Sequence, residues 1–184
     1  MPILAPETSL FPHDLLDRPA AGGQSWWVLY TLSRQEKPLM RRLERRSIGF
    51  YCPVVPRRYR SPAGRVRVSH LPLFSNYVFM LGDDDCRRTA LETNCVSRVL
   101  LADNVESLLN ELRQIQRLIG TGAPLTPEHR ILPGQRVRVR NGAFRGFEGL
   151  VVRREGETRL LVAVNFLQQG ASVLLDDCQL EAID

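Results

Sequence analysis

Two periodic patterns of apolar and polar residues divide the chain into a mixed first part and a strand-rich second part. From Val105 to Ile119, apolar residues recur at spacings of three and four, which is typical of an amphipathic helix with one buried stripe. From Arg136 to Arg140, arginine and valine alternate, which is the two-residue period of a strand with one buried face. The first pattern predicts a helix packed on a sheet, and the second predicts one wall of a separate β structure.

The chain before residue 120 is predicted to contain short apolar strands and helices. Trp26–Leu32 is rich in the aromatic and branched residues that strands prefer, and the capping-box spacing of Ser33 and Glu36 predicts a helix after it. Gly49 is expected to end that helix. An antiparallel sheet flanked by helices accounts for this order. The other elements predicted here are strands at Phe50–Pro56, Leu71–Leu81 and Val96–Ala102 and a short helix at Arg87–Thr93.

The segment Arg57–Val68 differs from its neighbours because it has few residues to bury. It is predicted to form a β-hairpin with its turn at Ser61–Gly64, and it carries five arginines and one aromatic residue, Tyr59. With so few apolar side chains, this hairpin is expected to project from its domain as an arm. Its arginines are Arg57, Arg58, Arg60, Arg65 and Arg67.

The second part follows a segment rich in glycine and proline, residues 120–133, which is predicted to be a linker. Five short strands with glycine-containing turns are predicted between residues 134 and 184, and they indicate a small β-barrel. Gly149 is expected to let two backbones approach closely. The residues expected to fill the barrel core are Val137, Val139, Val151, Leu161 and Val164.

Positive charge is concentrated in one third of the chain. The 184 residues carry a net charge of +5, but residues 25–82 alone carry eleven lysine or arginine residues and two acidic residues, a net +9. All but Lys37 of these cations are arginines, which fork onto phosphate and stack on bases. This block points to a polyanionic partner, with a merely solvated face as the alternative. Residues 133–184 sum to zero.

The sequence lacks the motifs of the common classes of enzyme and metal site. Its three histidines and four cysteines are scattered, and no nucleophile elbow, phosphate-binding loop or metal-ligand spacing occurs. The acidic run Asp83–Asp85 fits a helix N-terminus better than a metal site. We therefore expect no catalysis, no cofactor and no metal.

The remaining composition indicates a cytoplasmic protein without a membrane partner. No stretch approaches the ~18–20 apolar residues of a membrane span. Residues 1–24 lack the basic start and apolar core of a secretory signal. Because they are rich in proline, glycine and alanine, we expect them to form a flexible N-terminal tail.

Two motifs carry a resemblance to a known family. Gln135–Arg154, with its glycines and Phe144, resembles a KOW motif. Upstream, Trp26–Arg46 aligns without gaps with the start of an NGN domain, and Leu73–Phe79 resembles that domain's Phe-Pro-(Gly/Asn)-Tyr strand. Val96–Leu101 resembles a later NGN strand. NGN, linker and KOW in this order resemble the NusG family of transcription elongation factors over about residues 25–184.

The resemblance implies an α+β protein with an NGN domain at residues 25–119, a linker at 120–133 and a five-stranded KOW β-barrel at 134–184. It implies a monomer whose NGN domain docks on the clamp helices of the large RNA polymerase subunit and suppresses pausing. The polymerase-binding candidates are Trp27, Tyr30, Phe74, Tyr77 and Phe79. The candidates near upstream or non-template DNA are the arm arginines together with Arg41, Arg42 and Arg45. KOW would recruit a ribosomal protein or the termination factor Rho, with Phe144 and Phe166 as candidate contact or packing residues.

The sequence of the NGN segment is similar to the sequences of specialised paralogues of the RfaH type. Two segments depart from them: Leu32-Ser33 stands where such paralogues have a Lys-Arg pair that reads a DNA hairpin, and Cys86–Thr89 stands where they have His-Thr-Thr-Thr. The strands after residue 134 give no sign of a KOW domain that switches to helix. The general housekeeping factor and a ribosome- or RNA-associated KOW protein are the alternatives.

Overall fold

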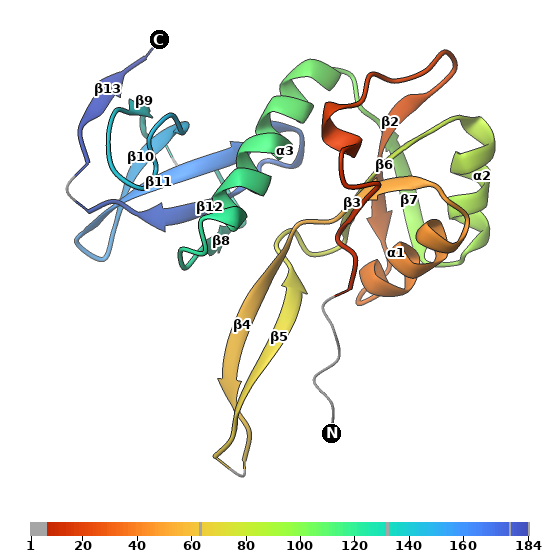
Figure 1. Ribbon diagram of the computed structural model, residues 1–184, viewed down its shortest axis with the longest axis horizontal. Coiled ribbons are helices and arrows are strands. Elements are labelled where there is room, and N and C mark those ends of the chain that lie inside the picture. The colour runs from red at the N-terminus through yellow and green to blue at the C-terminus, as the bar shows by residue number, and fades with distance from the viewer. Residues whose placement is uncertain (1–6, 63, 132, 177, 184) are drawn as a thin grey trace. The chain divides into compact units, whose positions relative to one another are not determined.

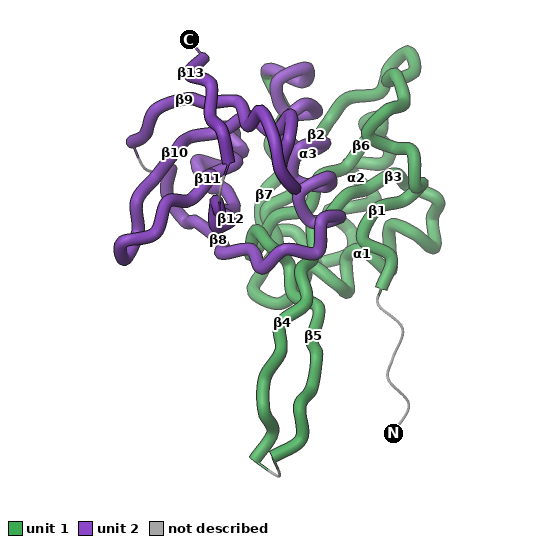
Figure 2. The backbone as a smooth tube through the Cα atoms, turned by 60° about the vertical axis from the view of Figure 1, so that its left-hand side comes forward, with its two compact units in different colours: residues 1–103 green, residues 104–184 purple. Residues whose placement is uncertain are grey.

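The computed structural model describes residues 7–62, 64–131, 133–176 and 178–183. The chain divides into two compact units, residues 1–103 and residues 104–184, and each contains its own antiparallel sheet (Figure 2). The predicted α+β class is confirmed. The division falls before the helix that was predicted to end the first domain, because that helix contacts strand β11 of the second unit.

Unit 1 is built on a five-stranded antiparallel sheet in the order β1-β3-β6-β2-β7 (Figure 1). Its strand β2 pairs with β6 on one side and β7 on the other. The strands are β1 (Leu10–Phe11), β2 (Ser25–Thr31), β3 (Gly49–Tyr51), β6 (Tyr77–Gly82) and β7 (Val96–Leu101). Its α-helices are α1 (Glu36–Arg45) and α2 (Asp84–Glu92), and a 3-10 turn, η1, spans Leu15–Asp17.

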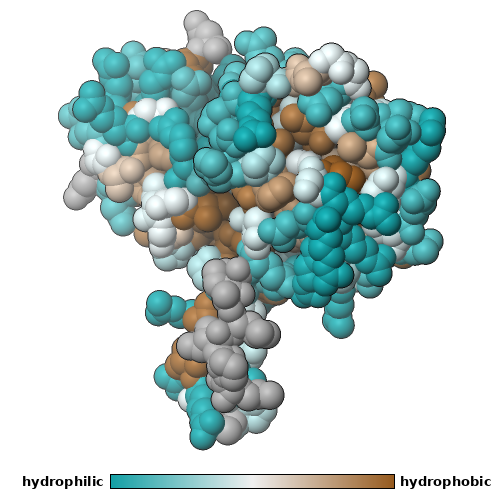
Figure 3. Space-filling model, turned by 45° about the vertical axis from the view of Figure 1, so that its right-hand side comes forward, coloured by the Kyte–Doolittle hydropathy of each residue, from teal (hydrophilic) through white to brown (hydrophobic). Residues whose placement is uncertain are grey.

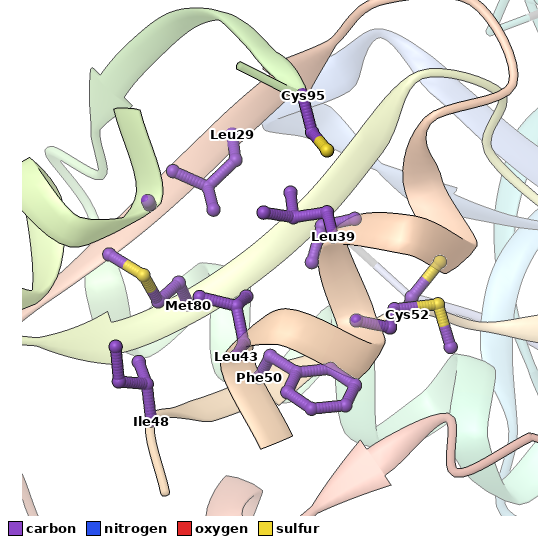
Figure 4. Packing of buried hydrophobic residues seen from close by; sticks show 11 residues of the cluster. Leu29, Leu39, Leu43, Ile48, Phe50, Cys52, Met80 and Cys95 are labelled. Atoms are coloured by element: carbon purple, nitrogen blue, oxygen red, sulfur yellow. The ribbon is translucent and has the colours of Figure 1, made fainter. Parts of the chain in front are cut away.

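One face of this sheet packs against α1 in a buried cluster (Figure 4). Leu39 and Leu43 of α1 lie on Leu29, Phe50 and Met80 of the sheet, all fully buried or nearly so. The spacing of the two leucines places them on one side of the helix, and the two-residue period places the sheet residues on one face. Cys52 lies in the same cluster, and burial raises the pKa of its thiol to about 12.

Buried hydrogen bonds join the start of α1 to the sheet. The Glu36 carboxylate is buried and accepts a hydrogen bond from the backbone N–H of Asn76 at 2.7 Å. The Asn76 side chain donates to the carbonyl of Thr31 at 3.1 Å, and its backbone adopts a left-handed φ of 71°. Asparagine tolerates that conformation better than most residues. The loop before β6 is therefore fixed to both β2 and α1.

The prediction of a flexible tail is wrong for part of residues 1–24; residues 1–6 lie outside the described residues. Strand β1 pairs with β3 and forms the edge of the sheet, and Leu15 and Leu16 of η1 are 2% and 1% exposed. The Leu15 side chain lies only 2.6 Å from where a Cβ on Gly49 would be. The apolar residues of this segment outweigh its prolines and glycines, because their burial offsets the entropy of ordering the chain.

Unit 2 consists of helix α3 and a six-stranded sheet in the order β13-β9-β10-β11-β12-β8. The extra strand β8 lies in the predicted linker and pairs with β12, so the sheet has one strand more than expected. A 3-10 turn, η2 (Asn165–Leu167), precedes β12. The elements are α3 (Val105–Gly120), β8 (Thr126–Glu128), β9 (Gln135–Val139), β10 (Glu148–Arg154), β11 (Glu157–Val164), β12 (Gln169–Leu174) and β13 (Leu180–Ala182).

The core of unit 2 agrees with the sequence pattern at four of the five predicted positions. Val137, Val139, Leu161 and Val164 are buried, whereas Val151 is half-buried and its neighbour Val152 is buried instead. The close approach predicted at Gly149 is confirmed, because a Cβ there would lie 2.4 Å from the backbone oxygen of Leu161. Both Leu160 and Leu161 are buried, so β11 is covered on both faces.

The packed N-terminal segment predicts a stability effect. Leu16→Ala should lower the free energy of unfolding by about 2–5 kcal/mol, since it removes buried methyl groups and leaves a cavity. Leu32→Ala is the matched control: Leu32 is 50% exposed, and the same change there should stay within about 0.5 kcal/mol. Urea unfolding followed by tryptophan fluorescence measures both, because both tryptophans lie in unit 1. Equal values for the two variants would contradict the packed segment.

The close backbone approach at Gly149 predicts a second effect. Gly149→Ala should lower the free energy of unfolding of unit 2 by about 1–3 kcal/mol, because the added methyl group pushes β10 away from β11. Gly120→Ala at the end of α3 is the control, since nothing lies within 4 Å of its Cβ position. Hydrogen exchange at the β10 and β11 amides measures the loss. Protection unchanged in Gly149→Ala would contradict the close approach.

Candidate nucleic-acid and protein interface

The arm predicted at Arg57–Val68 is a two-stranded ribbon that extends from unit 1 (Figure 1). Strand β4 (Val54–Arg60) pairs with β5 (Val66–Pro72) along its whole length. The turn is closed by a hydrogen bond from the N–H of Gly64 to the carbonyl of Ser61 at 2.8 Å. The side chains from Pro56 to Arg60 and from Arg65 to Val68 are all exposed, so the ribbon has no core of its own.

The arm carries positive charge that the fold does not neutralise. Between Val54 and Pro72 there are five arginines and no acidic residue. Within the described part of the chain, none of these arginines lies in an ion pair. Apolar side chains lie beside hydrophilic ones on the arm (Figure 3). Such a surface can contact phosphates without first breaking internal ion pairs.

Arginines elsewhere in the molecule are used differently. Arg87 of α2 lies 2.7 Å from Asp84, which holds the pKa of that carboxyl below its usual range. In unit 2, Arg138 bonds Glu148 at 2.6 Å, and this contact raises the pKa of the guanidinium. Further ion pairs join Arg140 to Glu181, Arg154 to Glu128 and Arg159 to Glu157. The charge of unit 2 is thus largely balanced by internal pairs.

The three helix arginines predicted to contact nucleic acid lie on α1, and two of them have internal partners. Arg41 is paired with Glu7 of the N-terminal segment, and Arg42 donates to the carbonyl of Thr93. Arg42 and Arg45 line a cavity of about 300 Å³. Arg41 and Arg42 are therefore less available than the arginines of the arm, whereas Arg45 is exposed.

The structure corrects two of the aromatic candidates for protein contact. Phe74 and Phe79 are 1% and 0% exposed, so they are packing residues with no surface for a partner. The sequence predicted that side chains of β6 alternate between the two faces of the sheet. It did not predict which side chains other parts of the fold cover. Trp27 is half-buried: its indole N–H donates to the carbonyl of Gly82 at 3.0 Å, and Arg87 of α2 lies over its ring.

Two of the candidates form a partly exposed pair. Tyr30 of β2 and Tyr77 of β6 are direct cross-strand partners, and their rings meet edge to face with centroids 5.2 Å apart. Partial burial and the neighbouring Tyr30 raise the pKa of Tyr77, while the positive charge of Arg98 opposes this shift. Arg98 pairs with Tyr30 from β7. Arg98 was not among the predicted site residues. The one indication in the sequence was that Arg98 lies in the strand predicted at Val96–Ala102.

The two phenylalanine candidates of unit 2 lie in different environments. Phe144 is buried and packs edge to face on Phe147, with ring centroids 6.2 Å apart, so it is a packing residue. Arg117 of α3 lies over the Phe147 ring at 4.7 Å. Phe166 in η2 is half-buried and retains surface for a contact.

The described residues hold neither a metal cluster nor a membrane-spanning helix. In the ranges that the structure describes, no group of three or more histidine, cysteine or acidic residues is placed to hold a metal ion. None of the helices described is long and apolar enough to span a membrane.

Comparison with known families gives two matches, and the first extends past the boundary between the units to include α3 and most of β8. The model of a family described as the transcription termination factor NusG matches residues 24–127, and a model of the KOW motif matches residues 133–164. Members of the NusG family are non-enzymatic transcription factors that act in elongation and antitermination and bind RNA polymerase. Because the first match spans more than half of the chain, this protein belongs to the NusG family.

Proposed function

We propose that this protein is a specialised elongation and antitermination factor that binds RNA polymerase through unit 1, nucleic acid through the arm, and a second protein through unit 2. The single observation that carries the nucleic-acid role is the arm itself, with five arginines, no acid and no internal ion pair in its described residues. Each arginine is exposed on a ribbon that has no core to stabilise.

Polymerase docking is assigned to the sheet face that carries Tyr30 and Tyr77. Half-buried aromatic residues serve as anchors in protein interfaces, because they bury a large area at low entropic cost. The edge-to-face contact between these two rings orients them before any partner arrives. By family resemblance, the partner surface is the clamp helices of the large polymerase subunit. Phe74 and Phe79 are buried, so we do not assign them to the contact.

The arm is assigned to upstream or non-template DNA. Arginine contacts to phosphates are electrostatic, and they release condensed counterions from the nucleic acid. The surplus of positive charge lies in residues 25–82, whereas residues 133–184 carry no net charge. Nucleic-acid affinity is therefore expected in unit 1.

Unit 2 is assigned to protein binding. Four of its arginines are paired with acids and residues 133–184 carry no net charge, so it presents no net field to attract a polyanion. The half-buried Phe166 is the contact candidate, and by resemblance the partner is a ribosomal protein or Rho. The sequence of the NGN segment favours a specialised paralogue over the general factor, although Leu32-Ser33 departs from the Lys-Arg pair with which such paralogues read a DNA hairpin. The KOW match itself supports the second candidate, a ribosome-associated protein.

Polymerase binding is tested with purified RNA polymerase free of nucleic acid. Tyr77→Ala should weaken binding by about fivefold or more, the loss expected above 1 kcal/mol at an interface anchor. Tyr59→Ala is the control, because it removes an exposed tyrosine from the arm and should leave this affinity unchanged. Thermal melts check that both variants are folded. A parallel assay uses purified ribosomal subunits, and binding to these subunits without binding to polymerase would favour the ribosome-associated alternative.

Nucleic-acid binding is tested by its salt dependence. The double variant Arg57→Ala/Arg67→Ala should flatten the slope of log affinity against log salt by about 0.7–0.9 for each phosphate that the protein no longer neutralises. Arg145→Ala/Arg153→Ala in unit 2 removes the same charge from two exposed arginines and should leave the slope nearly unchanged. Equal slopes for the two variants would mean that the arm arginines do not contact phosphates and only form a solvated face.

A further inference from the structure

The two faces of the arm are chemically different. In an antiparallel ribbon, directly opposed residues share a face, and successive residues alternate between faces. The register pairs Tyr59 with Arg67 and Arg57 with Ser69, so these four side chains lie on one face, the tyrosine face. The opposite face carries Arg58 and Arg60 with their partners Val68 and Val66.

Tyr59 has no role in the packing of the fold. It is 46% exposed, and no ring contact or hydrogen bond involves it among the described residues. Tyr51, by contrast, is 2% exposed, and burial raises the pKa of its phenol. A two-stranded ribbon outside a core is marginally stable in water, so an unpacked ring there gains its area of contact only from a partner.

The neighbours of Tyr59 restrict what that partner can be. Arg57 lies on the same face two residues before it on its own strand, and Arg67 lies directly across from it. A protein partner would need a matching cluster of acids around an apolar site. A nucleic-acid strand carries both features in every nucleotide, since it has an anionic phosphate and a base whose flat face stacks on an aromatic ring. The tyrosine face matches this repeat of charge and flat apolar surface.

We propose that the tyrosine face of the arm binds an unpaired stretch of nucleic acid, with Tyr59 stacking on one base while Arg57 and Arg67 contact the adjoining phosphates. The inference rests on the proposed function and specifies its ligand. In a duplex, each interior base is already covered on both faces by its neighbours, so stacking on Tyr59 requires an unstacked base. Single-stranded DNA and RNA share this chemistry.

The test measures binding of the full chain to one labelled mixed-sequence strand, as DNA, as RNA and as a blunt DNA duplex. Tyr59→Ala should weaken binding to the tighter of the two single strands by about 5- to 150-fold, the effect of removing one base–aromatic stack. Duplex binding should be unchanged. The salt slope should also be unchanged, because every arginine that reaches a phosphate remains in place. Tyr59→Phe should bind as the unmodified protein does, since the ring remains.

Val68→Ala is the matched control, because it removes an exposed apolar side chain from the opposite face. It should change neither affinity. A 2-aminopurine base in the strand gives a direct readout, since its fluorescence should be quenched by the unmodified protein and by Tyr59→Phe but not by Tyr59→Ala. A greater effect on DNA or on RNA identifies which strand the arm prefers, and either one supports the stacking role.

Two results would overturn the inference. If Tyr59→Ala weakens single strand and duplex equally, the ring supports the arm or a groove contact and does not stack on an unpaired base. If it weakens neither, the ring is solvated. Both leave the proposed nucleic-acid role intact as long as Arg57→Ala/Arg67→Ala flattens the salt slope. If that double variant has no effect, the proposed role of the arm fails independently of Tyr59.

Discussion

The pairing of β2 with β6 and β7 is the constraint on which unit 1 depends. This strand is bonded on both edges, and its alternate residues face the two sides of the sheet. Leu29 thereby enters the cluster beneath α1, and Tyr30 points to the opposite side beside Tyr77. The register with β7 shifts between Tyr30 and Thr31. Irregular pairing of this kind re-aims a side chain at the end of a strand, and here it occurs at the residue assigned to the polymerase contact.

The same side chain, arginine, has opposite roles in the two units. On α2 and at Arg138, Arg140, Arg154 and Arg159 of unit 2, it is held by carboxylates, and its charge is balanced within the fold. On the arm, five guanidinium groups lie close together with no acid between Val54 and Pro72, so they repel one another. Exposed ion pairs contribute at most about 1 kcal/mol each, so folding alone does not explain why the arm lacks them. A partner that supplies the negative charge, as proposed above for nucleic acid, would account for it.

Elements with a clear period could be predicted from the sequence, and elements with none could not. Helix α3 begins at the predicted Val105, and strands β9 to β13 of the unit 2 sheet lie close to their predicted positions. Strands β1 and β8 have two and three residues, too few to show a period, and both were assigned to a tail or a linker. They form because each adds hydrogen bonds to the edge of a sheet that already exists.

The positive charge of the candidate site could be predicted from the sequence, but which of its aromatic residues are exposed could be predicted only in part. Charge counts located the arginine-rich arm, because exposed arginines need no tertiary context to be recognised. Burial of aromatic residues does need that context: Tyr77 and Phe79 lie on the same face of β6, yet Tyr77 retains exposed surface and Phe79 is fully buried. Alternation along one strand cannot distinguish them, since the difference comes from what covers each end of the face.

Phe74 illustrates how a buried residue can still control both proposed contacts. It lies in the four-residue connection between Pro72, where the arm ends, and Tyr77. At its side, the N–H of Leu73 donates to the carbonyl of Pro53 at 2.7 Å, which closes the root of the arm. At the other end of this connection, Asn76 is bonded to Glu36 and Thr31. Leu73 and Phe74 are buried in unit 1 and lie in the connection that joins the arm to Tyr77, so we expect a substitution of Phe74 to disturb both surfaces without removing a residue that contacts either partner.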